Sequence, residues 1–356
     1  MKHMLKISTI AAAGVLALGV ATAQAESLTI VSWGGAYTKS QVGAYHKPFT
    51  KMTGITINSD DYNGGLAEVQ AQVQAGNVTW DLVDVELSDA IKGCDEGILE
   101  RIDHSILPAA PDGTPAKDDF IVNTLTECAV GEIVWSTVFA YDDTKFSGAK
   151  PTTLNDLFDT AKFPGKRGLR KSPRVNLEWA LMADGVAPGK VYETLGTEAG
   201  VTRAFKKLDT IKGDTIWWEA GAQPPQMLAD GEVTMTSAYN GRLFNAQFVE
   251  KKPFVIVWDN QVWDLDLWVI PKGTPRLKNA LEFVKFSTDT QRLADQTKFI
   301  SYGPVRKSSM ALVAKDMQPH MPTFPANFKT ALQNDFEFWA DNNDELNERF
   351  QAWLAK

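Results

Sequence analysis

Aromatic and acidic side chains gather in this sequence where β-strands are predicted to end. They are Trp33, Tyr37, Glu86, Trp217, Tyr239, Trp263, Asp264 and Asp266. An aromatic ring face attracts an ammonium group by about 0.5–2 kcal/mol. A charge-assisted hydrogen bond to a carboxylate adds comparable strength and sets the direction. The rings would form the walls of a site and Asp264 or Asp266 its negative charge, so these residues predict binding of a small cation.

Arg242 adds a group that a site for a purely cationic ligand does not need. A guanidinium grips a carboxylate with a two-pronged fork of N–H donors. Arg242 and Asp266 follow successive predicted strands, so both can face one cleft. A group that binds a cation beside a group that binds an anion predicts a zwitterionic ligand, such as an ω-amino acid. The structural alternative for Arg242 is an ion pair between two parts of the protein.

The elements that must position these side chains alternate between strand and helix. Apolar β-type runs at 27–33, 55–57 and 80–85 are separated by segments with helical spacing, and the rhythm restarts with runs at 168–171, 215–218 and 232–239. This alternation predicts an α/β fold with parallel strands and helical crossovers. In open α/β sheets, ligands lie beyond the carboxyl ends of the strands.

Two longer β-type runs, at 132–141 and 262–271, suit strands that cross between the two αβ units. No Pro/Ser-rich linker accompanies them, so the layout predicts a hinged cleft. Successive side chains of a strand point to opposite faces. We therefore expect one of Trp217 and Trp218 in a core and the other in the cleft.

Residues 1–25 predict a secretory signal peptide. Lys2 and Lys6 give a positive start, residues 7–20 are mostly apolar, and Ala23-Gln24-Ala25 forms a small-x-small cleavage site. The apolar run is short for a membrane span, which leaves a membrane anchor as the weaker alternative. We expect cleavage after Ala25 and a soluble, exported protein.

Export permits a disulfide bond between the two cysteines, Cys94 and Cys128. Closing that loop restricts the unfolded chain by about 4 kcal/mol in the entropy model. Redox-active pairs more often have Cys-x-x-Cys spacing. We therefore expect a structural bond without chemistry of its own.

Composition argues against two classes of function. The formal net charge is −8, and an acidic chain repels phosphate backbones, so we expect no nucleic-acid partner. His46, His104 and His320 lie far apart without a metal-type partner at short spacing. We therefore expect neither a metal site nor a cofactor.

Four segments in register resemble a known family. They read Ile-Val-Ser-Trp-Gly-Gly-Ala-Tyr at 30–37, Trp-Asp-Leu-Val-Asp-Val-Glu at 80–86, Ser-Ala-Tyr-Asn-Gly-Arg at 237–242 and Trp-Asp-Leu-Asp-Leu-Trp-Val-Ile-Pro at 263–271. Together with the signal peptide, they resemble the spermidine/putrescine group of periplasmic solute-binding proteins of ABC importers. The resemblance covers essentially all of the chain after residue 25. Arg242 makes the sequence most similar to the branch that includes gamma-aminobutyrate receptors.

The resemblance implies a type II periplasmic binding protein, with two discontinuous αβ lobes joined by a hinge of two crossing strands. On this basis residues 26–136 and 265–315 form lobe 1, and residues 137–264 and 316–356 form lobe 2. It further implies a periplasmic monomer that is not an enzyme. The protein would bind a small amine or zwitterion and offer it to an ABC permease in the inner membrane.

The site residues of the family correspond unevenly to this sequence. Trp33 and Tyr37 match an aromatic pair at the ligand, although one extra residue separates them, and Asp266 matches the polyamine carboxylate. Tyr239 stands where the family has a tryptophan, and Tyr302 corresponds to a tyrosine late in the family's sequences. Asp264, next to Trp263, stands where the family has a second tryptophan. A further family carboxylate near 172–176 has no clear counterpart, which argues against a long polyamine.

Two other functions remain as alternatives. An exported enzyme could use Asp264 and Asp266 as paired carboxylates, although Gly-x-Ser-x-Gly, His-Glu-x-x-His and phosphate-loop motifs are missing from the sequence. A ferric-ion receptor of the same fold would need clustered Tyr oxygens, and the seven tyrosines are scattered. A basic run at 162–174 is interpreted as a solvated strand edge, with permease docking as the alternative. The choice among gamma-aminobutyrate, putrescine, spermidine and related amines stays open.

Overall fold

A computed structural model of the protein describes residues 26–356. The predicted signal peptide, with its cleavage site after Ala25, lies outside the described residues. The strands form one 11-stranded sheet. They are β1 (Ser27–Ser32), β2 (Thr56–Asp61), β3 (Leu82–Glu86), β4 (Leu125–Thr126), β5 (Ala129–Asp142), β6 (Arg167–Arg170), β7 (Thr215–Trp218), β8 (Met235–Tyr239), β9 (Phe254–Val269), β10 (Gly303–Pro304) and β11 (Leu332–Gln333).

Helices connect the strands and cover the sheet. They are α1 (Gly35–Gln41), α2 (Lys47–Thr53), α3 (Ala67–Gln74), α4 (Leu87–Asp95), α5 (Ala116–Asp119), α6 (Leu154–Phe158), α7 (Asn176–Ala183), α8 (Val191–Leu195), α9 (Glu198–Lys212), α10 (Gln223–Ala229), α11 (Asn240–Phe244), α12 (Leu277–Ser287), α13 (Thr290–Gln296), α14 (Lys307–Met310) and α15 (Phe336–Leu354). The segment with helical spacing between the first two strands forms α1 and α2, joined by a π-helical turn at Val42–His46.

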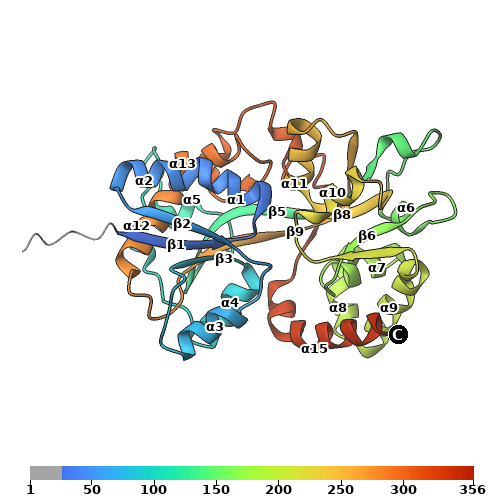
Figure 1. Ribbon diagram of the computed structural model, residues 1–356, viewed down its shortest axis with the longest axis horizontal. Coiled ribbons are helices and arrows are strands. Elements are labelled where there is room, and N and C mark those ends of the chain that lie inside the picture. The colour runs from blue at the N-terminus through green and yellow to red at the C-terminus, as the bar shows by residue number, and fades with distance from the viewer. Residues whose placement is uncertain (1–25) are drawn as a thin grey trace, which may run out of the picture.

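The order of the strands divides the sheet into two halves. The order is β2-β1-β3-β9-β5-β8-β6-β7. On one side β1 is parallel to β2 and β3, and on the other β6 is parallel to β7 and β8. We call the part built on β1–β3 the first half and the part built on β6–β8 the second half; Figure 1 shows them at the left and right. The predicted α/β class, with parallel strands in two units, is confirmed.

The central strands β5 and β9 are antiparallel and run through both halves. They pair from Ala129 with Val269 to Asp142 with Phe254. Both strands extend beyond the predicted runs, and β9 starts at Phe254. The sequence did not reveal its early part because Asp259 and Asn260 interrupt the apolar pattern, and Asn260 has a left-handed φ of 55°.

Each half has its own hydrophobic core, and the central strands contribute to both. The first core includes Ile30, Val134 and Leu265, whereas the second includes Phe139 and Val262. A third, smaller cluster of buried side chains contains several aromatic residues, including Tyr37, Trp135, Trp218, Tyr239 and Tyr302. Each half is therefore packed around its own core, with two continuous strands between them.

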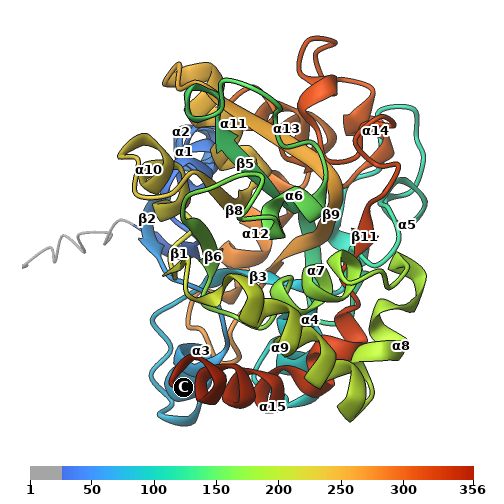
Figure 2. The same cartoon turned by 90° about the vertical axis from the view of Figure 1, so that its right-hand side faces the viewer.

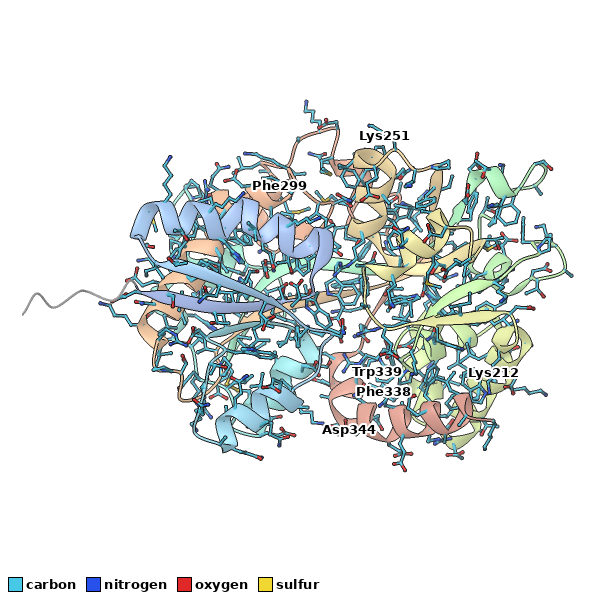
Figure 3. All side chains as sticks on the ribbon, in the orientation of Figure 1. Lys212, Lys251, Phe299, Phe338, Trp339 and Asp344 are labelled. Carbon is cyan, nitrogen blue, oxygen red and sulfur yellow. A yellow bond between two sulfur atoms is a disulfide. The ribbon has the colours of Figure 1, made fainter. Side chains whose placement is uncertain are left out.

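The last helix, α15, runs along the lower edge of the molecule (Figures 1 and 2). It starts at Asp335, whose side chain accepts a hydrogen bond from the Phe338 amide at 3.0 Å, a typical N-cap. Trp339 and Phe350 are buried in the second core. Asp344 lies where α15 approaches the first half (Figure 3) and pairs there with Lys92 of α4 at 2.6 Å.

Cys94 and Cys128 form a disulfide bond with a Cα–Cα distance of 5.7 Å, as the sequence predicts. The bond joins α4 to the residue just before β5. Within residues 26–356, no helix is long and apolar enough to cross a membrane.

Replacing both cysteines by serine should lower the free energy of unfolding by about 4 kcal/mol, because the unfolded chain regains the freedom of a 34-residue loop. Urea unfolding measures this difference. A reducing agent should lower the midpoint of the wild-type protein and leave the double variant unchanged. Equal midpoints for oxidised wild-type and variant proteins would contradict a stabilising role.

Candidate ligand-binding site

Strand ends from both halves meet around two adjoining cavities. In the first half β3 ends at Glu86 and Trp33 follows β1, while in the second half β6 ends at Arg170 and β8 at Tyr239. We call the first space the aromatic cavity; it comprises about 250 Å³ of space between atoms, part of it open to solvent. Its lining residues are Trp33, Tyr37, Glu86, Trp135, Tyr239, Arg242, Asp266 and Tyr302.

Edge-to-face contacts fix the rings of the aromatic cavity. The ring centroids of Tyr37 and Tyr302 lie 5.1 Å apart at an interplanar angle of 89°. Trp135 meets Tyr239 at 5.1 Å and 81°. Such pairs contribute about 0.5–1.5 kcal/mol beyond the area that they bury. The rings are therefore held in place before any ligand arrives.

Asp266 supplies a buried carboxylate to this cavity. Its Oδ1 accepts a hydrogen bond from Trp135 Nε1 at 2.6 Å. Burial, and then the charges of Asp84, Glu86 and other nearby acids, raises the pKa of Asp266 well above its ordinary value. Among residues 26–356, no ion pair involves Asp266. A cation bound in the cavity would relieve this accumulation of negative charge.

Arg242 brings a positive charge to the same cavity. Its Nη atoms donate hydrogen bonds to the carbonyl oxygens of Gly34 at 2.9 Å and Trp33 at 2.7 Å, across the two halves. Its guanidinium lies 5.8 Å from the ring centroid of Tyr239. A Cβ on residue 35 would stand 2.8 Å from Nη1, so this close approach requires Gly35. Within the described chain Arg242 has no carboxylate partner, and its Nε has no hydrogen-bond acceptor.

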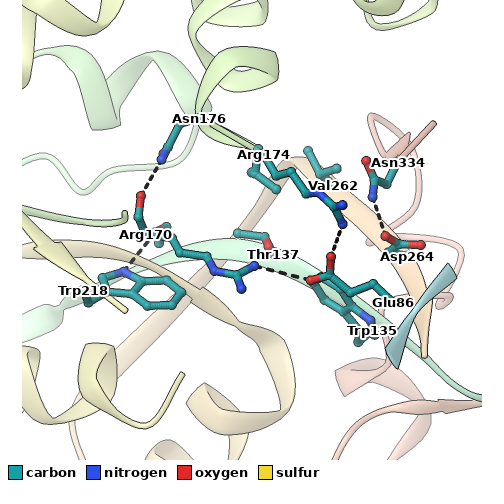
Figure 4. Close-up of a pocket in the computed structure, with 12 residues that line it drawn as sticks. Glu86, Trp135, Thr137, Arg170, Arg174, Asn176, Trp218, Val262, Asp264 and Asn334 are labelled. Carbon is teal, nitrogen blue, oxygen red and sulfur yellow. Dashed lines mark hydrogen bonds and ion pairs between the residues drawn. The ribbon is translucent and has the colours of Figure 1, made fainter. Parts of the chain in front are cut away.

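The second space, which we call the arginine cavity, comprises about 430 Å³, part of it open to solvent, and shares Glu86 and Trp135 with the first. Glu86 Oε1 accepts a hydrogen bond from Arg170 Nη1 at 3.3 Å. Its other oxygen contacts Arg174 Nη1 (Figure 4). Burial opposes ionisation of Glu86, but Arg174 and Arg170 overcome it and lower its pKa. The pairing links β3 of the first half to the second half.

Asp264 also lines the arginine cavity, where the Asn334 side-chain amide donates to its carboxylate (Figure 4). Burial and the nearby Glu86 charge raise the pKa of Asp264 to about 7. Asp264 and Asp266 share one face of β9, as expected for residues two apart. However, they border different cavities.

A pair of buried acids behind the aromatic cavity was not predicted. The Gln41 side-chain amide donates to Asp84 at 2.7 Å and to Glu132 at 3.0 and 3.1 Å. The Tyr37 hydroxyl donates to Glu132 at 3.3 Å. Burial raises the pKa of Asp84 to about 6, and burial together with Asp84 raises that of Glu132. The one sign of this role in the sequence is that Glu132 is an acidic residue within the otherwise apolar run at 132–141.

The structure brings most of the predicted residues together. Seven line the aromatic cavity: Trp33, Tyr37, Glu86, Tyr239, Arg242, Asp266 and Tyr302. Asp264 lines the arginine cavity. Whether any of them contacts a ligand stays a prediction.

Two predicted tryptophans lie elsewhere. Trp217 packs against Phe350 and Trp353 of α15, at centroid distances of 5.4 and 5.7 Å. Trp263 packs against Phe328 at 5.6 Å. Neither lines the two cavities. Because strand side chains alternate, their neighbours Trp218 and Asp264 face the arginine cavity instead.

The interpretation of the basic run as a solvated strand edge is wrong for three of its members. Arg167 is fully buried and donates to the backbone carbonyls of Leu157, Gly165 and Asp159. Arg170 and Arg174 line the arginine cavity. For Arg170 and Arg174 the counter-charge is Glu86, more than 80 positions earlier in the chain, so the basic run alone could not reveal it.

Comparison with known proteins identifies the family. The model of the family of bacterial extracellular solute-binding proteins matches residues 44–323. A gamma-aminobutyric acid-binding protein of Pseudomonas aeruginosa is 45% identical over 343 residues, which cover 96% of this chain and 95% of the relative. The chain belongs to the bacterial extracellular solute-binding protein family.

Solved structures agree with this assignment. The periplasmic binding protein MotA of A. tumefaciens B6, in complex with glucopine, superimposes with a TM-score of 0.85 at 29% identity, covering 92% of this chain and 99% of that one. A GABA receptor superimposes with a TM-score of 0.80 at 35% identity, covering 93% and 98%. The solute-binding protein therefore has the periplasmic binding protein fold that the sequence predicts.

Substituting Asn for Asp264 should stabilise this solute-binding protein at alkaline pH. The folded-state pKa of about 7 exceeds the ordinary 3.8, so ionisation of Asp264 lowers stability progressively as the pH rises through this window. At pH 8 the variant should be more stable by roughly 2–4 kcal/mol, and near pH 4 the difference should vanish. Asn keeps one oxygen that can accept from Asn334 and gives up the second bond, from the Leu265 amide, which sets the lower end of this range.

Thermal unfolding between these pH values measures the effect. Glu232→Gln, which neutralises an exposed acid, is the matched control and should follow the wild-type curve. The same pH dependence in wild type and Asp264→Asn would show that Asp264 does not titrate in this window.

Proposed function

We propose that this solute-binding protein is the extracytoplasmic component of an ABC importer and captures a zwitterionic ω-amino acid of the gamma-aminobutyrate type. The observation that carries the proposal is the pair Asp266 and Arg242. Both line one cavity of about 250 Å³, and neither has an oppositely charged partner among residues 26–356. The binding proteins named for gamma-aminobutyrate among its relatives support the same ligand class.

In the proposed complex, Asp266 holds the ammonium group against the rings of the aromatic cavity. The ring faces attract the cation, and Asp266 fixes its direction with a charge-assisted hydrogen bond. Arg242 holds the carboxylate with the donor capacity that its backbone contacts leave free. Such a ligand replaces two missing counter-ions at once, whereas a diamine would satisfy Asp266 alone.

Closure of the two halves would trap the ligand. β5 and β9 pass from the first core to the second between Val134 and Phe139 and between Val262 and Leu265, which supports the lobe boundaries at 136/137 and 264/265. Contacts across the cleft, such as Arg242 with the carbonyls of Trp33 and Gly34, would form on closing. A ligand that contacts both halves favours the closed state.

The remaining parts of the proposal concern the setting. The chain would lose residues 1–25 by cleavage after Ala25, act as a monomer in the periplasm, and deliver its ligand to an ABC permease in the inner membrane. The family assignment and the Cys94–Cys128 bond support an oxidising, extracytoplasmic compartment.

The two alternatives receive less support. Asp264 and Asp266 border different cavities, which is poor geometry for joint acid–base work on one bond. Tyr37, Tyr239 and Tyr302 do meet in one cavity, although the sequence suggested scattered tyrosines. However, the Tyr37 hydroxyl is already engaged as a donor to Glu132 at 3.3 Å, and the relative that is 45% identical is named for gamma-aminobutyric acid.

Two substitutions test the ligand class by calorimetric titration. Wild-type protein should prefer gamma-aminobutyrate over n-butylamine, which lacks the carboxylate, by at least about 10-fold, since a hydrogen bond to a charged group contributes about 1.5–3 kcal/mol. Arg242→Met should remove that preference. Asp266→Asn should weaken both ligands, because both carry the ammonium group.

The preference ratio is the informative quantity because loss of the Arg242 contacts to Trp33 and Gly34 would weaken both ligands alike. An Arg242→Met variant that keeps the wild-type ratio would refute the role of Arg242. An Asp266→Asn variant with undiminished affinity would refute the proposed cation site.

A further inference from the structure

The arginine cavity has the chemistry of an anion-binding site. Arg170 and Arg174 each direct one Nη1 to a different oxygen of the Glu86 carboxylate. Two guanidinium groups thus bind both oxygens of one carboxylate by charge-assisted hydrogen bonds, one from each arginine. Arg174 is held in position by Asn343, which accepts from its Nε at 3.1 Å, and by Trp339, whose ring centroid lies 5.6 Å from its guanidinium. Arg174 is therefore held in position by contacts other than the anion that it binds.

The anion that occupies this site comes from the opposite half of the protein. Glu86 ends β3 in the first half, whereas Arg170 ends β6 in the second half and Arg174 follows it. The ion pairs of Glu86 with Arg170 and Arg174 therefore bridge the two halves. The carboxylate of Glu86 thus occupies the position between the two arginines of the second half that the carboxylate of a ligand could occupy.

The neighbouring acids do not make Glu86 redundant. Asp89 lies 3.7 Å from Arg174, at the edge of favourable contact. Asp264 accepts hydrogen bonds from Asn334 and the Leu265 amide, and burial raises its pKa to about 7. Glu86 therefore provides the main counter-charge for the two arginines.

Glu86 also stands next to the proposed cation site. In the pairing of β3 with β9, Glu86 lies directly opposite Asp266. The two cavities share Glu86 and Trp135 as lining residues. A ligand held at Asp266 by its ammonium group thus meets Glu86 at the point where a longer chain would continue into the arginine cavity.

We propose that the arginine cavity is a second, carboxylate-binding compartment of the cleft, and that Glu86 fills it and so limits the length of the ligand. This inference rests on the proposed function, because it assumes an ammonium group at Asp266. Without Glu86, an acid in solution would take its place between Arg170 and Arg174, or the single carboxylate of a longer ω-amino acid would bind there instead of at Arg242.

The first experiment detects the compartment without an amine ligand. Sodium acetate at about 0.1 M, compared with sodium chloride of equal ionic strength, should raise the thermal midpoint of Glu86→Ala by about 2 °C or more and barely affect wild-type protein. Adding Arg174→Gln to Glu86→Ala should abolish the response. A Glu86→Ala protein that responds to acetate no more than wild type would overturn the anion site.

The second experiment tests the limit on length, with straight-chain ω-amino acids from 4-aminobutyrate to 8-aminooctanoate. Wild-type protein should bind the shortest best, and Glu86→Ala should shift the optimum to longer chains by about 10-fold in relative affinity. Lys92→Gln is the matched control, because it removes an ion pair between the halves outside the cavities. It should leave the order of preference unchanged.

The outcomes separate this inference from the proposed function. The same loss of affinity at every length in Glu86→Ala, or no change at any length, would overturn the limiting role of Glu86 while 4-aminobutyrate binding to wild type stands. A wild-type protein that binds none of the series, together with an acetate response of Glu86→Ala, would refute the ω-amino acid ligand and retain the anion compartment.

Discussion

The structure depends on a buried carboxylate that the described chain leaves without a positive partner. Asp266 lies among four other acids, Asp84, Glu86, Glu132 and Asp264, whose charges raise its pKa beyond the effect of burial. Arg170 and Arg174 neutralise Glu86, whereas Asp266 receives only a hydrogen bond from Trp135. Ionising Asp266 in this setting costs free energy, and its raised pKa expresses that cost. A ligand that carries an ammonium group offsets this cost, which links affinity directly to the charge arrangement of the cleft.

The contacts between the two halves leave the choice between open and closed forms to the ligand. Buried ion pairs such as Glu86 with the two arginines gain Coulomb energy on closing but lose hydration, and the two effects nearly cancel. The pair Lys92–Asp344 is exposed, with 30% and 78% of the side chains accessible, and such pairs contribute about 0–1 kcal/mol. A modest difference in ligand contact between the two forms is then sufficient to shift the population.

The sequence predicted the strand ends and most side chains of the aromatic cavity, because the carboxyl ends of strands in α/β sheets face a common edge. It could not predict which side chains of each strand point to which face of the sheet. Trp217 faces α15 and Trp218 the arginine cavity, a choice that depends on packing from residues more than 100 positions away. The burial of Arg170 and Arg174 was missed for a similar reason, since Glu86 reaches them from another half. Local sequence shows a charge but not the distant residue that neutralises it.

Calorimetry of gamma-aminobutyrate binding near pH 7, in buffers of different ionisation enthalpy, tests the central claim most directly. A bound ammonium group lowers the raised pKa of Asp266 and its neighbours, so the protein should release protons on binding, and affinity should rise with pH. The Asp266→Asn variant should release fewer protons on binding than the wild-type protein. Binding with no proton exchange, or with proton uptake, would contradict the account.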